Sequence, residues 1–187
     1  LREDISDEIE LSTRPESHVT DVKLVDTGAW SDVASNQRLG LELAGAIGSF
    51  TTRFEYMRND WKRDDGSRNH FRGAYLEGGY FFGGVPFRYH NGQFMRPDLA
   101  GYGVAYEVAW RYSWIDLNDG DIQGGEERNL GLALNVYPRM GLRIQSNLIL
   151  VNADQPGDHV RTPNATRAAT TATTARTIKV RRCDADT

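Results

Sequence analysis

The sequence predicts an all-β fold of antiparallel strands that run up and down. Three observations support this class. Apolar and polar residues alternate with a period of two in most segments, which gives a strand one apolar and one polar face. The 19 glycines, 4 Trp, 8 Tyr and 7 Phe are spread over segments that turn residues separate. No stretch of about 18 apolar residues occurs, which excludes a transmembrane helix, and no long amphipathic helix is visible.

Composition limits the class of protein further. The 187 residues suffice for one ordinary domain or two small ones. The net charge of −4 gives no sign of a nucleic-acid binder. The single cysteine, Cys183, excludes an internal disulfide and a cysteine-based zinc site. The acidic start, residues 1–10, lacks the apolar centre of a signal peptide. Either such a peptide has been removed or the chain begins inside a longer protein.

The first predicted strands lie before residue 62. Residues 19–30 alternate around Lys23, and residues 37–47 alternate leucines with charged or small residues. Gly48-Ser49 is a two-residue break suited to a tight hairpin with glycine at its first central position. Residues 50–61 then form the returning strand.

The middle of the chain supplies two more strands. Residues 71–83 alternate aromatic or aliphatic residues with small or acidic ones. Two prolines and an Asn91-Gly92 turn signal interrupt residues 84–102. The clearest strand follows at about 103–117. One parity of it holds Tyr106, Val108, Trp110, Tyr112 and Trp114, and the other holds Glu107, Ala109, Arg111 and Ser113.

The last two predicted strands are residues 129–137 and 142–152, joined by a four-residue turn at 138–141. They bring the number to about seven. Residues 159–187 are rich in Thr, Ala and Arg and have no alternating apolar face, so we expect a low-complexity, disordered tail. Residues 1–158 then form the folded domain.

Periodicity alone does not decide which face of these strands is buried. A soluble β-sandwich buries its aromatics, whereas a membrane barrel turns them to lipid. The sequence predicts tight turns at 48–49 and 138–141 and long polar loops at 59–70, 84–102 and 116–128. Short turns at one end and long loops at the other favour the barrel. Aromatics at strand ends fit the interfacial girdle of a barrel as well as a soluble core: Trp30, Trp61, Trp114 and Tyr137.

The polar face of the strands carries the candidate binding residues. Five cations lie on the parity opposite the apolar stripe: Lys23, Arg38, Arg53, Arg111 and Arg143. Four glutamates share that face: Glu42, Glu55, Glu77 and Glu107. Composition alone favours a solvated sheet face with salt bridges. The functional alternative is a water-filled lumen in which guanidinium groups attract anions, since arginine stays charged and its planar fork fits phosphate oxygens.

No residue pattern supports an enzyme, a metal site or a cofactor. The four histidines are scattered over loops without metal-ligand spacing. Residues 116–127 resemble a calcium-binding EF-hand loop, but the required glycine stands one place early and strands flank the loop instead of helices. We therefore expect an incidental acidic loop there.

The order of the segments resembles the phosphate-selective porin family, the outer-membrane porins O and P, in its C-terminal half. The resemblance covers about residues 10–158. The matching stretches are "RPESHV…KLVDTG" (14–28), "RLGLELAGAIGSFTTRFEYM" (38–57), "GAYLEGGYFFGG" (73–84), "YEVAWRYSWIDLNDGDIQGGEERNLGLALNVYP" (106–138) and "LRIQSNLILVNAD" (142–154).

This resemblance implies part of a transmembrane β-barrel in the cell outer membrane, with about seven strands here of a sixteen-stranded barrel. It further implies passive passage of phosphate or polyphosphate, contact with outer-membrane lipid, and a homotrimer of the full-length parent. The aromatics of 106–114 should then face lipid, and Arg111 should face the lumen. Two alternatives remain: a truncated or frame-shifted porin fragment without activity, and a soluble β-sandwich that binds a ligand.

Overall fold

The computed structural model describes residues 8–14, 16, 23–87, 89–95, 98–139, 142–154 and 166–177. Its strands are β1 (Ile9–Thr13), β2 (Val25–Trp30), β3 (Val33–Ile47), β4 (Phe50–Arg63), β5 (Arg68–Phe82), β6 (Tyr89–His90), β7 (Gln93–Phe94), β8 (Ala105–Asp119), β9 (Ile122–Arg139), β10 (Leu142–Asp154) and β11 (Thr166–Thr177). None of the described residues belongs to a helix that could span a membrane.

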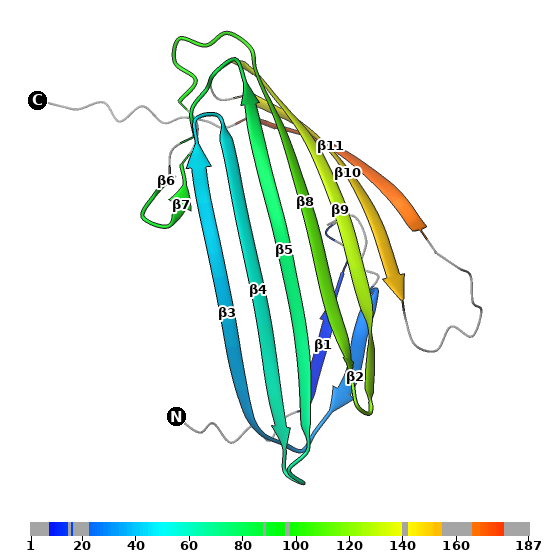
Figure 1. Ribbon diagram of the computed structural model, residues 1–187. Helices are drawn as coiled ribbons and strands as arrows, with labels where there is room; N and C mark the ends of the chain where they lie inside the picture. The colour runs from blue at the N-terminus through cyan, green and yellow to red at the C-terminus, as the bar shows by residue number, and fades with distance from the viewer. Residues whose placement is uncertain are drawn as a thin grey trace, which may run out of the picture.

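Seven long strands form one sheet in the order β11-β10-β9-β8-β5-β4-β3, and every neighbouring pair is antiparallel. They stand side by side as a tall, curved wall (Figure 1). Neighbours in space are neighbours in the chain, apart from the β6–β7 hairpin inserted between β5 and β8. The all-β, antiparallel, up-and-down class predicted from the sequence is confirmed, and the architecture is that of a partial barrel.

One face of the sheet is apolar and uncovered. The leucines of β3 are between 52% and 64% exposed, and Ile47 is 84% exposed. We call this side the outer face; it also carries the exposed Leu76, Tyr80, Val108, Tyr112, Leu130, Leu132 and Leu134. Because these side chains stay exposed, no described element packs over them as the second sheet of a sandwich would. The aromatic parity of β8 lies on this face, as the resemblance implied.

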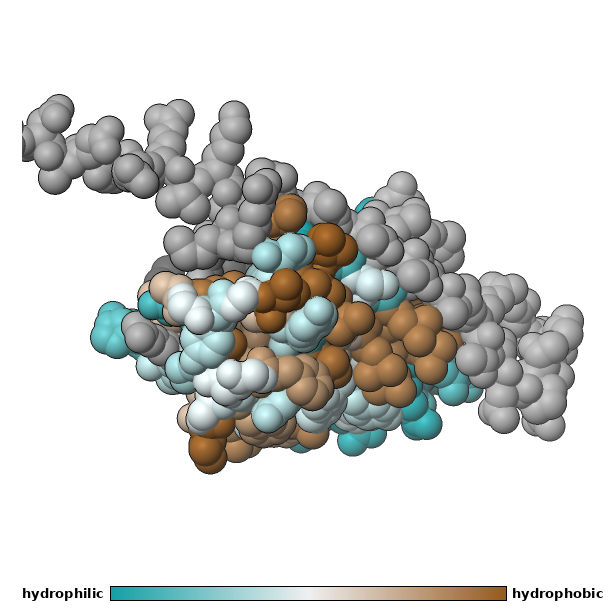
Figure 2. Space-filling view, turned by 90° about the horizontal axis from the view of Figure 1, so that it is seen from above, coloured by the Kyte–Doolittle hydropathy of each residue, from teal (hydrophilic) through white to brown (hydrophobic). Residues whose placement is uncertain are grey.

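The opposite side, the inner face, is covered at both ends. At one end the β1–β2 hairpin packs on it through a cluster of Val25, Val33, Trp61, Phe71, Leu117 and Ile122. At the other end Phe81, Val85 and Ala105 form a second cluster with Phe87 and Tyr137. Figure 2 looks down on this second end and shows apolar residues over much of it. The zone between the two clusters is polar.

Two of the predicted loops are wrong. Only residues 64–67 separate β4 from β5, and only Gly120-Asp121 separates β8 from β9. The strands continue to pair in both regions. The side chains that point to the outer face are polar there, and the apolar side chains point to the inner face. Among the latter, Trp61, Phe71 and Leu117 belong to the first cluster. Each strand has only one or two apolar residues in these regions, which is too few to produce a recognisable alternating pattern, so the sequence predicts loops there.

The sequence predicts short turns at one end of the sheet and long loops at the other. The structure does not show this separation. The two-residue Gly48 turn is confirmed, with Gly48 at φ +57°. The long connection 83–104 joins β5 to β8 at the same end as that turn (Figure 1). The assignment of the apolar parity to the outer face therefore rests on its exposure and not on the lengths of the turns.

Two further segments differ from the sequence-based description. The described part of the first predicted strand contains β2, which pairs with β1 outside the main sheet, and residues 19–22 lie outside the described residues. Alternation did not predict β1. Part of the segment expected to be a disordered tail is strand β11, which pairs along β10 from Leu142 to Asn152. Its composition is compatible with this, since threonine is enriched in strands. The rest of that tail lies outside the described residues.

Candidate functional site

A cavity of about 450 Å³ occupies the polar zone of the inner face, between the two apolar clusters. Small residues of β5, β8 and β9 form its floor: Gly79, Ala109, Gly131 and Ala133. The floor is low because these positions lack long side chains. A methyl group added to Gly79 would lie 3.2 Å from Thr51 Oγ1. Charged and aromatic side chains surround it: Glu16, Arg53, Glu77, Phe87, Phe94, Glu107 and Arg111.

Three charged residues cross the sheet in a single rung. Arg53, Glu77 and Arg111 are direct cross-strand partners on β4, β5 and β8. The carboxylate of Glu77 lies between the two guanidinium groups. Its Oε2 accepts a hydrogen bond of 2.7 Å from Arg111 Nη1, and its Oε1 lies 3.8 Å from Arg53 Nε. Register fixes this arrangement, since directly opposite residues project from the same face.

Arg111 is the most constrained of the three. Its Nε donates to Glu16 Oε1 at 2.7 Å, across 95 residues of chain, and its guanidinium carbon lies 3.7 Å from the centre of the Tyr75 ring. A guanidinium has five N–H donors. The bonds to Glu16 and Glu77 occupy two of them, so three have no hydrogen-bond acceptor among the described residues.

Arg53 is held more loosely. Its Nε lies 3.9 Å from Glu42 Oε1 and 3.8 Å from Glu77 Oε1, both longer than a hydrogen bond. This Nε is buried, and no hydrogen-bond acceptor reaches it within the described residues. The Phe94 ring of β7 lies 5.4 Å from the guanidinium carbon. The Nε of Arg53 is thus unpaired but buried, so a solute in the cavity would meet the terminal nitrogens of this guanidinium and not its Nε.

The rest of the cavity rim offers further polar groups. Glu107 Oε2 accepts hydrogen bonds from Asn135 Nδ2 at 3.0 Å and from the Tyr137 hydroxyl at 2.7 Å. Gln145 donates to Asn147 Oδ1 at 3.0 Å. The lining contains the two arginines of the rung against three glutamates, which gives a formal charge of −1. The arginines therefore act within a compensated environment, not an excess of positive charge.

The structure brings two of the five predicted cations together and separates the other three. Arg53 and Arg111 share the central rung. Arg38 lies on the inner face of β3, opposite Asn59 and away from the cavity. Arg143 lies near the start of β10 and interacts with the Tyr137 hydroxyl. Lys23 precedes β2, outside the main sheet, and pairs with Glu10 and Asp26.

Sequence reasoning missed the partners that enter the site from outside the sheet. Parity placed Glu77 beside the arginines, but nothing in the sequence indicated that Glu16 would contact Arg111. Phe87 and Phe94 belong to the connection 83–104, for which the sequence predicts a polar loop. No group of three or more His, Cys, Asp or Glu side chains in the described part of the chain could hold a metal ion.

Comparisons with known proteins agree with this architecture. The family model of "phosphate-selective porin O and P" matches residues 2–178. An uncharacterized protein of Caulobacter vibrioides is 33% identical over 144 residues, which cover 74% of this chain and 29% of that protein. The chain thus spans less than a third of the length of this relative.

Proposed function

The chain belongs to the phosphate-selective porin O and P family, and on that premise we propose that it forms part of the wall of an anion-selective channel in the outer membrane. Porins are channels and not enzymes, and the family is named for its selectivity for phosphate. The proposed activity is passive diffusion of phosphate or polyphosphate along the inner face. The full-length protein is proposed to form a homotrimer.

The observation that carries this proposal is the rung of Arg53, Glu77 and Arg111. Two guanidinium groups flank one carboxylate beside a cavity whose floor is made of small residues. A phosphate has oxygens on several sides and accepts hydrogen bonds well from guanidinium N–H groups. A passing phosphate would bind the donors of Arg111 and Arg53 that the carboxylates leave open.

The neighbouring glutamates favour the passage of a phosphate through the channel over its tight binding. A channel needs solute binding that is favourable enough for entry and weak enough for exit. Two uncompensated arginines would hold a phosphate strongly. With Glu16 and Glu77 already bound to Arg111, a phosphate gains only the remaining donors and is repelled by the carboxylates. We propose that the glutamates set the residence time of the anion.

The outer face supports the proposed location. Leucines and aromatics on β3, β8 and β9 remain exposed along one side of the sheet, and hydrocarbon is the solvent in which such a face is stable. The interior strands of the sheet pair with neighbours on both sides. Pairing of backbone groups between strands is the condition for crossing a membrane without helices.

Single-channel recording on the full-length protein in planar bilayers tests this function. The reversal potential in a potassium phosphate gradient should show anion preference. Substituting Arg111→Gln should lower the phosphate-to-potassium permeability ratio by about tenfold, the effect of losing one charged hydrogen bond. Arg58→Gln is the matched control, because Arg58 lies on the outer face and bonds to Asp60. A cation-selective wild-type channel, or equal effects of both variants, would defeat the proposal.

A further inference from the structure

A second hollow lies on the outer face, on the opposite side of the sheet from the lumenal cavity. It measures about 370 Å³, and Phe54, Ala74, Leu76, Tyr112, Trp114 and Arg128 line it. These residues come from β4, β5, β8 and β9. The hollow is thus a groove in the sheet surface, with apolar walls and one cationic residue at its rim.

Register explains where the groove lies. One rung across four strands consists of Phe54, Leu76, Tyr112 and Leu130, and the next consists of Tyr56, Ala74, Trp114 and Arg128. Ala74 is the smallest residue of these two rungs, and its short side chain leaves the space between Phe54 and Trp114 open. The groove therefore begins in the apolar zone and ends at Trp114 and Arg128.

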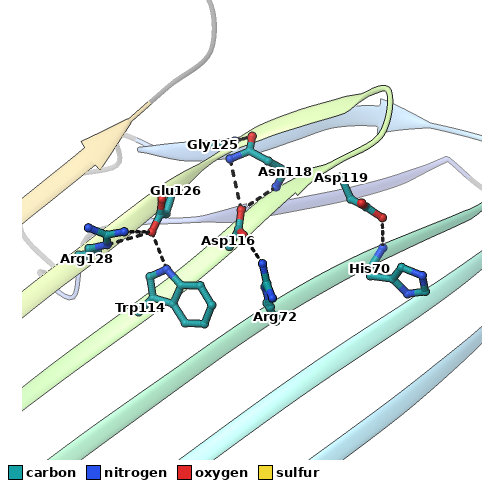
Figure 3. A network of polar contacts seen from close by, with 9 residues as sticks. All are labelled: His70, Arg72, Trp114, Asp116, Asn118, Asp119, Gly125, Glu126 and Arg128. Carbon is teal, nitrogen blue, oxygen red and sulfur yellow. Dashed lines mark hydrogen bonds and ion pairs between the residues drawn. The ribbon is translucent and has the colours of Figure 1, made fainter.

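The rung beyond the groove is entirely charged. It contains Arg58, Arg72, Asp116 and Glu126. Successive outward rungs on a strand are about 7 Å apart, so the outer face changes from apolar to charged over about 14 Å, or two such steps. Trp114 stands at the transition, where its indole Nε1 donates to Glu126 Oε1 at 2.6 Å (Figure 3).

Two cations near this end of the groove point outward, Arg72 of the charged rung and Arg128 of the rung before it. Arg72 is 57% exposed and pairs with Asp116, which is 17% exposed; Arg128 is 53% exposed and pairs with Glu126, which is 30% exposed. In each pair the carboxylate is the less exposed partner, and Figure 3 shows both ion pairs. The Arg72 guanidinium also lies 5.6 Å from the centre of the Trp114 ring. Two oriented guanidinium groups thus stand above an apolar groove.

We propose that this groove binds a lipid whose headgroup carries a phosphate. An acyl chain would lie against Phe54, Leu76 and Tyr112 over Ala74, while the phosphate would accept hydrogen bonds from Arg128 and Arg72. The negative charge of a phosphate complements Arg72 and Arg128, and the lining changes from apolar to cationic along the groove. Both features favour a lipid with a phosphate headgroup over a neutral lipid. The inference rests on the proposed membrane location but not on which solute passes through the lumen.

Native mass spectrometry of the full-length protein in detergent tests the site. The probes are dioctanoyl phosphatidic acid, dioctanoylglycerol with the same acyl chains, and inorganic phosphate. We expect the wild type to retain phosphatidic acid about tenfold more than dioctanoylglycerol, and to retain no inorganic phosphate at this site. Arg128→Gln should reduce phosphatidic acid to the level of dioctanoylglycerol. Ala74→Phe fills the groove without changing charge and should reduce both lipids.

Two control variants separate the site from general effects. Arg68→Gln removes an exposed cation near the 64–67 turn, away from the groove, and Leu41→Phe adds an aromatic ring to the outer face outside it. Both should bind phosphatidic acid as the wild type does. Equal retention of the two lipids, no retention of either, competition by inorganic phosphate, or an unaltered Arg128→Gln variant would each overturn the proposal. Lumenal selectivity of Arg128→Gln should stay unchanged, so failure here is distinct from failure of the channel function.

Discussion

The indole of Trp110 lies directly over Gly78 on the neighbouring strand. The two are register partners between β5 and β8, and a methyl group placed on Gly78 would lie 2.8 Å from Trp110 Nε1. No real side-chain carbon approaches another atom so closely, so the position requires glycine as long as the indole stays there. The absence of a side chain at residue 78 is thus a packing requirement, because Trp110 fills the space that Gly78 leaves.

Replacing Gly78 with alanine should therefore destabilise the sheet. The added methyl would displace the Trp110 ring, and overpacking of this kind costs about 1–3 kcal/mol. Urea unfolding of the full-length protein in detergent, followed by tryptophan fluorescence, measures this. Gly40→Ala is the control, because a methyl there would meet no atom within 4 Å. Equal midpoints for the two variants would contradict the packing argument.

Replacing Glu77 with glutamine should strengthen phosphate binding in the lumen. The change removes the negative charge shared by Arg53 and Arg111 while keeping the shape of the side chain. The conductance should then saturate at about tenfold lower phosphate concentration, with a smaller maximal current because exit slows. Conductance-concentration curves in potassium phosphate measure both effects. Glu55→Gln, on the same face of β4, serves as the control, and an unchanged half-saturating concentration in Glu77→Gln would contradict the assigned role.

Replacing Gly125 with alanine should disturb the start of β9 and the docking of the β1–β2 hairpin. Gly125 has φ +96°, and a methyl there would lie 2.7 Å from the Asp154 carbonyl oxygen and 3.0 Å from Val25. Backbone strain and the clash together should cost about 2–4 kcal/mol. Limited proteolysis should then cut faster within residues 8–30 than in the wild type. Unchanged cleavage would show that the hairpin does not depend on this contact.

The Asp121 side chain should make stability depend on pH. Its carboxylate lies in the β8–β9 turn, where hydrogen bonding to Asn69 and the charge of Arg63 lower its pKa. A lowered pKa in the folded state contributes stability above the unfolded value of about 3.9 and loses it as the pH falls through the folded value. The melting temperature of Asp121→Asn should be below that of the wild type at pH 7, and the difference should shrink as the pH falls through the folded pKa of Asp121. A constant difference across this range would contradict the linkage.

Much of the main sheet could be predicted because six of its seven strands alternate in sequence. Parity also placed Arg53, Glu77 and Arg111 on one face. The family predicted from the ordered segments is confirmed by the family match over residues 2–178. Which arginines meet across the strands depends on register, which parity does not give. The strand extensions near residues 59–70 and 116–128 were missed because the apolar residues change faces there, which interrupts the periodic signal.

The contacts that complete the site lie beyond this kind of prediction for a physical reason. Glu16 reaches Arg111 across 95 residues, and Phe94 reaches Arg53 from the connection between β5 and β8. Both segments lack periodicity, and their positions follow from packing on the inner face. The β11 pairing is similar, since its position is set by the edge of β10 and not by an apolar pattern of its own.

The central rung also has a limited range of action. Arg53 and Arg111 carry two positive charges, while Glu77 and the bound Glu16 carry two negative ones, so the group is neutral as a whole. Ionic screening reduces the field of exposed charges beyond about 8 Å at physiological salt, and a neutral group produces still less at that distance. This part of the wall therefore cannot gather anions from the bulk solution. It distinguishes solutes only on contact, by how well their oxygens fit fixed N–H donors, and that discrimination should persist at high ionic strength.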